Sequence, residues 1–252
     1  MANNYELVEK FELISSKAWP AEDSRNLDGW TLRSSKGVTW RANSVLPFSS
    51  LINLTLDEAI ESVVQYYQER NLIPAFKLTY CCHPTNLDKV LDSKGFKKEM
   101  ETYVQIAPLN NGSSESGRYS VKISEMLKQD WVSAYFKLGE FTSFELENRI
   151  DIIKRIQTGK AFASVRAGGM IVGIGMGVIV DQALGLFGII TDPHHRGKGV
   201  GSSINAALMS WGKERGASVA YLQVEKENTP ALSLYSKCGF SIIYDYWYRI
   251  LR

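Results

Sequence analysis

The stretch HHRGKGVGSSI, residues 194–204, combines a bare backbone with positive charge. Glycines let the backbone approach a ligand closely and adopt positive φ values, so that successive N–H groups can point at one anion. The apolar spacing that follows predicts a helix, which adds free N–H groups and the positive end of its dipole. Arg196 and Lys198 supply mobile positive charge, and His194 and His195 either join them or are simply exposed turn residues. Such a stretch suits a pyrophosphate group.

Two common phosphate motifs do not fit these residues. A P-loop requires G-x-x-x-x-G-K-[ST], but here a glycine follows the lysine and Asp192 holds the first glycine position. A dinucleotide fingerprint requires G-x-G-x-x-G, and Ser202 occupies the position of its third glycine. The pattern that does fit is R-x-x-G-x-G, formed by Arg196, Gly199 and Gly201.

A second group of residues lies in NTPALSLYSKCGF, residues 228–240. Thr229-Pro230 is typical of a helix start, so Asn228 and Tyr235 are expected at the beginning and on the body of one short helix. This stretch has the form N-x-x-A-x-x-L-Y-x-x-x-GF. Together with R-x-x-G-x-G, in that order and spacing, it resembles the acyl-CoA-binding motifs of the GCN5-related N-acetyltransferase (GNAT) superfamily. The resemblance covers roughly residues 118–252.

The resemblance implies the GNAT fold, an α/β protein with a mixed α+β sheet, and acetyl-CoA as the acyl donor. It places the pantetheine arm of CoA along a strand end and the pyrophosphate on the N–H groups of the glycine stretch. No metal is expected. The implied cofactor-binding residues are Ile189, Ile190, Thr191, Arg196, Gly197, Lys198, Gly199, Val200, Gly201, Ser202 and Asn228.

Acetyl transfer to an amine requires an oxyanion donor, a proton for the departing thiolate and a neutral nucleophile. The resemblance assigns the first to a backbone N–H near Ile190 and the second to Tyr235, whose phenol is protonated at neutral pH. Gln223 stands where some superfamily members have a glutamate base, and glutamine cannot accept a proton. Glu225, on the same face of the predicted strand, is either the base or a solvated carboxylate at a strand end.

No cysteine or serine near the motifs is placed to carry the acyl group, so we expect direct attack in a ternary complex. The acceptor is expected to be a small-molecule or peptide amine, whose identity the sequence does not specify. A different class of function is also compatible with these residues, namely a non-catalytic acyl-CoA-binding or regulatory protein.

The elements that must position these residues alternate between strand and helix. Apolar periodicity and turn residues predict strands at 119–123, 161–166, 170–181, 183–190, 219–225 and 241–251. They predict helices at 127–138, 145–156 and 229–237, and one that starts at 200 and is stopped by Gly216. Alternation of this kind predicts a sheet covered by helices.

The N-terminal half repeats part of this order, with helices predicted at 59–67 and 86–96 and strands at 74–80 and 97–107. LDSKGF at 91–96 aligns with LYSKCGF at 234–240, which indicates an internal duplication. Asp92 stands where Tyr235 does, and no glycine stretch precedes it, so this copy is degenerate.

The stretch PLNNGSSESG reads as a linker, because it lacks the aromatic and β-branched residues that would order it. We therefore expect three parts, which are a degenerate GNAT-like domain at 1–107, a linker at 108–117 and a catalytic GNAT domain at 118–252.

Composition limits the partners. The chain has 252 residues, 44% of them hydrophobic, and a net charge of only +2, which argues against nucleic acid or an anionic membrane as the main partner. Three cysteines, Cys81, Cys82 and Cys238, fit neither a disulfide framework nor a zinc site. With no signal-peptide pattern and no run of about 18 apolar residues, a cytoplasmic location is expected. The oligomeric state is not readable.

Overall fold

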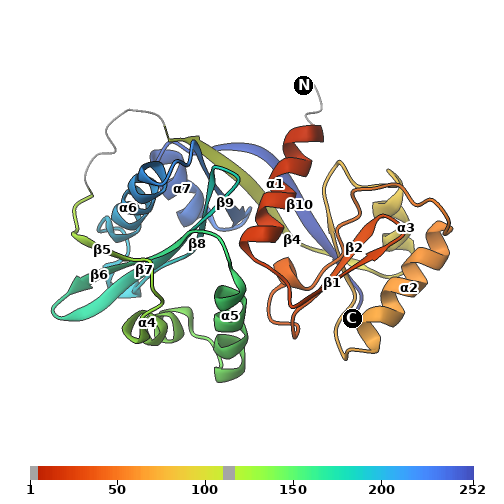
Figure 1. The fold of residues 1–252 in the computed structure, drawn as a ribbon, viewed down its shortest axis with the longest axis horizontal. Helices are drawn as coiled ribbons and strands as arrows, with labels where there is room; N and C mark the ends of the chain where they lie inside the picture. The colour runs from red at the N-terminus through yellow and green to blue at the C-terminus, as the bar shows by residue number, and fades with distance from the viewer. Residues whose placement is uncertain (1–4, 110–116) are drawn as a thin grey trace. The chain divides into compact units, whose positions relative to one another are not determined.

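The computed structural model describes residues 5–109 and 117–252 (Figure 1). The chain forms two compact units, and each unit is built from segments that are not contiguous in the sequence. The first spans Met1–Tyr103, Asn148–Arg155 and Tyr244–Arg252, and the second spans Val104–Glu147 and Ile156–Ile243. Most of the expected linker at 108–117 lies outside the described residues, and the internal duplication with its domain borders stays a prediction. None of the described helices has both the length and the apolar character of a membrane span.

The second unit is built on a mixed sheet, which confirms the predicted α/β class. Its strands are hydrogen-bonded in the order β4-β9-β8-β7-β6-β5, antiparallel from β5 to β8 and parallel between β8 and β9. The strands are β4 (Lys97–Pro108, in part), β5 (Val121–Ser124), β6 (Lys160–Ala167), β7 (Met170–Val180), β8 (Ala183–Thr191) and β9 (Val219–Glu225). The helices are α4 (Gln129–Gly139), the start of α5 (Ser143–Arg155), η2 (Pro193–His195), α6 (Val200–Glu214) and α7 (Thr229–Lys237).

Alternate glycines of β7 explain how α6 packs on this sheet. Gly173, Gly175 and Gly177 lie on one face of the strand, because side chains alternate between faces. A Cβ on Gly173 would overlap Val200, and one on Gly175 would stand 2.7 Å from Cγ2 of Ile204. The helix therefore packs directly on the strand backbone, and its apolar side chains at Val200, Ile204, Leu208 and Trp211 are buried. This contact fixes the N-terminus of α6 beside the sheet.

Helix α4 covers the opposite face of the same strands (Figure 1). Its Trp131 donates a hydrogen bond from Nε1 to the carbonyl of Ala163 in β6, at 3.0 Å, and packs edge-on against Phe162. The second unit thus has three layers, with α6 on one side of the sheet and α4 on the other.

The first unit contains α1 (Tyr5–Ala18), a hairpin of β1 (Asp23–Leu27) and β2 (Trp30–Ser34), η1 (Trp40–Ala42), α2 (Leu56–Gln68), β3 (Ala75–Leu78) and α3 (Leu87–Ser93). Its larger strands follow the order β3-β10-β4, where β10 is Ser241–Ile250 and is antiparallel to β3. Helix α2 begins at a capping box in which Thr55 and Glu58 satisfy each other's backbone N–H groups. A core of buried apolar side chains, including Trp30, Tyr67 and Phe76, holds the unit together.

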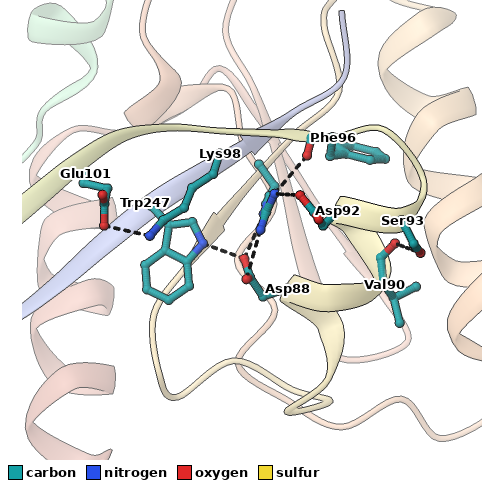
Figure 2. Close-up of polar contacts among 9 residues, drawn as sticks. Asp88, Val90, Asp92, Ser93, Phe96, Lys98, Glu101 and Trp247 are labelled. Atoms are coloured by element: carbon teal, nitrogen blue, oxygen red, sulfur yellow. Dashed lines mark hydrogen bonds and ion pairs between the residues drawn. The ribbon is translucent and has the colours of Figure 1, made fainter.

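The position that aligns with Tyr235 has a structural role in this unit. Asp88 and Asp92 of α3, both labelled in Figure 2, accept hydrogen bonds from the guanidinium group of Arg249 in β10. Asp88 receives hydrogen bonds from Nε of Arg249 at 2.9 Å and from the indole of Trp247 at 2.7 Å. Hydrogen bonding to Arg249 lowers the pKa of the Asp88 carboxyl group below its usual value. These contacts fix α3 to β10.

Candidate active site

The glycine stretch lies between the end of β8 and the start of α6. Gly199 is the N-cap of α6, and Gly197 and Gly199 have φ values of +72° and +95°, which residues with a Cβ rarely adopt. Asp192 closes the preceding turn, because its carboxylate accepts the N–H of His194 at 2.9 Å and lies 3.3 Å from Nδ1 of His195. That hydrogen bond to His195 is the main reason why the pKa of Asp192 is lowered. The His194 backbone and the His195 ring thus both contact Asp192 within the turn.

The loop presents its charge to solvent. Arg196, Gly197 and Lys198 are exposed. Nε of Arg196 donates to the carbonyl of Thr191 at 3.3 Å, which ties the loop to the end of β8. In the described part of the chain, Lys198 makes no ion pair. The side chain of Val200 is buried, and that of Ser202 is partly exposed.

The last third of β8 has one open edge. β8 pairs with β9 only at Ala183, Leu184 and Gly185. Between these two described strands, the residues of β8 from 186 to 191 form no further pair with β9. Against β7 the register shifts, so that two residues of β8, at 188 and 189, oppose one residue of β7. Such a bulge leaves its extra residue outside the ladder. The open edge and the bulge therefore offer backbone polar groups to a ligand.

Strand alternation identifies one N–H group on that edge. The N–H of Asp192 donates to the carbonyl of Val172 in β7 at 2.9 Å. Neighbouring residues of a strand point their N–H groups to opposite edges, so Thr191 directs its N–H away from β7. Residues 189–191 are partly exposed. The predicted pantetheine-binding residues are thus at the accessible end of the strand.

Three elements converge at Gly201. A Cβ on this residue would stand 3.1 Å from Cδ2 of Leu234 in α7 and 3.8 Å from Oγ1 of Thr191 in β8. Gly201 therefore lies where the loop helix, the open strand end and the helix that carries Tyr235 meet, and the absence of a side chain at 201 permits this close packing.

Helix α7 has the predicted bounds. Asn228 is its N-cap and accepts the N–H of Ala231 through Oδ1 at 3.2 Å, so its Nδ2 group is the part left to contact a ligand. Tyr235 is half-buried and packs edge-on against Phe240, with ring centroids 5.8 Å apart. Glu225 is exposed at the end of β9, where its carbonyl accepts the N–H of Asn228 at 3.0 Å. Gln223 is half-buried on the same strand.

Two residues beside this site belong to no recognisable sequence motif. Gly188 is part of the bulge and has a φ of +55°, but a single glycine in an apolar run has no specific spacing. Arg118 lies beside Gly199, with its Cδ 3.4 Å from the position of a Cβ there. Only the folded chain brings these residues to the loop, because 81 positions, 199 minus 118, separate them in the sequence.

The glycine loop at the N-terminus of α6, the open end of β8 and α7 with its tyrosine occur in one unit and in the order that the resemblance predicts. This fold and this site define the class of GCN5-related N-acetyltransferases.

Comparison with known proteins supports this class along nearly the whole chain. Residues 8–249 match the family described as "Probable histone acetyltransferase Rv0428c C-terminal". The uncharacterized N-acetyltransferase YobR of Bacillus subtilis (strain 168) is 30% identical over 248 residues, which cover 97% of this chain and 99% of YobR. The chain belongs to the Rv0428c C-terminal family, and it is an acyltransferase of the GNAT superfamily.

Solved structures share the fold at low sequence identity. The GCN5-related N-acetyltransferase from Kribbella flavida has a TM-score of 0.69 and 13% identity, with 99% of this chain and 96% of that chain covered. A tandem GNAT protein from the clavulanic acid biosynthesis pathway has a TM-score of 0.56 and 10% identity, with 74% and 66% covered. The predicted GNAT fold is therefore confirmed.

Proposed function

We propose that the protein transfers an acetyl group from acetyl-CoA to a primary amine by direct attack in a ternary complex. The observation that carries this proposal is the open end of β8, which lies beside the glycine loop and meets α6 and α7 at Gly201. It is an extended backbone edge next to a cluster of free N–H groups, which suits a long ligand with an amide-containing arm and a pyrophosphate.

The chain's own groups can hold such a donor. The N–H groups of residues 197–202 can donate hydrogen bonds to the pyrophosphate, and Arg196 and Lys198 add charge that is accessible from solvent. The N–H of Thr191 and Nδ2 of Asn228 can bind carbonyl groups of the pantetheine arm. When bound, acetyl-CoA supplies the activated acyl carbon.

The same residues can assist the chemistry. An amide N–H of the bulge, next to Ile190, can donate a hydrogen bond to the thioester carbonyl oxygen as negative charge develops on it. Tyr235 can give its proton to the departing sulfur, since a phenol (pKa ~10) is protonated at neutral pH and the transfer to a thiolate whose conjugate acid has a pKa of ~8.5 costs only about 2 kcal/mol. Glu225 is the proposed base, directly or through water, since Gln223 cannot take a proton.

The acceptor is proposed to be a small-molecule or peptide amine rather than a nucleic acid or a membrane. The family's description names histones, so histone peptides belong in an acceptor screen beside small amines. We also propose the tandem organisation, with a degenerate copy at 1–107 and the catalytic copy at 118–252, and the tandem GNAT neighbour supports it. The cytoplasmic location stays a prediction.

Thiol release tests the function. The purified protein is given acetyl-CoA and pools of amines, and free CoA is detected with a thiol reagent. We expect acceptor-dependent release with at least one pool and none without acceptor. If acetyl-CoA binds tightly but no amine, amino acid or peptide pool stimulates release, the non-catalytic acyl-CoA-binding alternative replaces this proposal.

A further inference from the structure

A short segment before β5 is fastened to the first turn of α6. The N–H of Tyr119 donates to Oγ of Ser203 at 3.2 Å, and that hydroxyl group donates to the carbonyl of Gly199 at 2.9 Å. A Cβ on Gly117 would overlap Ser203, so the absence of a side chain at 117 is what permits this close approach. The segment is therefore positioned against the helix end that carries the glycine loop.

This attachment places Arg118 over Gly199. Its Cβ and Cγ lie 3.8 Å, and its Cδ 3.4 Å, from the position that a Cβ on Gly199 would take. The guanidinium group follows directly after Cδ, so the loop lies within its reach. Arg118 is exposed, and within the described ranges 5–109 and 117–252 it makes no hydrogen bond or ion pair.

An exposed arginine without a carboxylate partner beside the glycine loop is available to bind an anionic group of a ligand. We infer that Arg118 is an additional phosphate ligand for the acyl-CoA donor, and this inference rests on the proposed function. A guanidinium group binds phosphate through two parallel N–H groups, so it adds direction as well as charge to the contacts of Arg196 and Lys198. It approaches the loop from a segment that lies outside both sequence motifs.

Arg118→Met is the test, because methionine keeps much of the apolar stem that packs on Gly199 and removes the charge. The control is Arg215→Met at the other end of α6, where Arg215 pairs with Glu125 and the net charge falls by the same amount. Binding of CoA and of 3′-dephospho-CoA is measured by calorimetry for the parent protein and each variant, and thermal melting confirms that the variants fold.

We expect Arg118→Met to weaken CoA binding by about 10-fold, the value of one charge-assisted contact, and Arg118→Lys to recover part of the loss. Arg215→Met should bind within twofold of the parent. A loss that disappears with 3′-dephospho-CoA identifies the 3′-phosphate as the partner, and a loss that persists identifies the pyrophosphate.

Two results overturn the inference while the proposed function stands, given that the parent protein binds CoA. One is unchanged affinity in Arg118→Met, and the other is an equal loss in Arg215→Met, which would indicate a general effect of charge. A parent protein that binds no CoA contradicts the proposed function and the role of Arg118 together.

Discussion

Replacing Gly201 by alanine separates donor binding from folding. Gly201 is the second residue of α6 and has no positive φ, so alanine fits its backbone and gains up to about 1 kcal/mol of helix propensity. Against this gain stands one close contact, 3.1 Å to Cδ2 of Leu234, which is the tip of a flexible side chain. We expect the free energy of unfolding to change by less than about 1 kcal/mol, which shifts Tm by no more than about 4 °C.

The same methyl group would stand between Leu234 and Thr191, beside the backbone N–H groups and the strand end that the proposed site offers to the ligand. A hydrogen bond to a charged group contributes about 1.5 kcal/mol or more. Loss of one or two such bonds corresponds to a 10- to 100-fold weaker affinity, at about 1.4 kcal/mol per factor of ten. Valine should have a larger effect. At Gly199 valine is a poorer test, because a φ of +95° strains any residue with a Cβ.

Calorimetry with acetyl-CoA and thermal melting, run on the same samples, measure the two effects separately. Ser210→Ala is the matched control, since it changes a residue of the same helix that is more than two turns from the loop. It should alter neither affinity nor catalysis. A Gly201→Ala protein that melts normally and binds acetyl-CoA as the parent does would refute the assignment of this loop as the donor site.

Three further predictions concern other groups. Tyr235→Phe keeps the ring and removes the proton, so kcat should fall about 10- to 1000-fold while acetyl-CoA affinity stays nearly constant; parent-like turnover from pH 6 to 9 would exclude this acid. Asp88 has a lowered pKa in the folded protein because of Arg249, so its contribution to stability is complete above the unfolded value near ~3.9 and is lost as pH falls through the folded value. The melting difference between the parent and Asp88→Asn should therefore shrink from pH 7 to pH 3, and a constant difference would contradict this. Burial raises the pKa of Cys81 and of Cys82 to about 11, so iodoacetamide at pH 8 should label both only after unfolding in urea, and rapid labelling of the folded protein would show that they are accessible.

Some elements were predictable because their signals are local. The predicted strand at 219–225 and helix at 229–237 have the observed bounds of β9 and α7. Gly216, before the strand, and Thr229-Pro230, at the start of the helix, act through backbone preferences of neighbouring residues. The helix stripe of α6 was readable for the same reason, since its buried residues recur at a fixed spacing.

Helix α1 was not predicted, and Glu12 is part of the reason. This glutamate is 1% exposed and interrupts the apolar face that would mark a helix. It is accommodated by an ion pair with Lys77 of β3 and by a hydrogen bond from the hydroxyl group of Tyr244 in β10, at 2.8 Å. Partners 65 and 232 positions away cannot be read from a window of neighbouring residues.

The sequence by itself determined the loop chemistry, the class of fold and the family, because these depend on residue types at short and fixed spacings. Only the tertiary structure decided which backbone polar groups are left accessible to a ligand. The free edge of β8 exists because β9 stops pairing at Gly185 and because the register with β7 shifts at the bulge. Arg118 reaches Gly199 because Ser203 fastens a distant segment to α6. Strand register and contacts between distant segments are set by packing of the whole unit, which no local pattern contains.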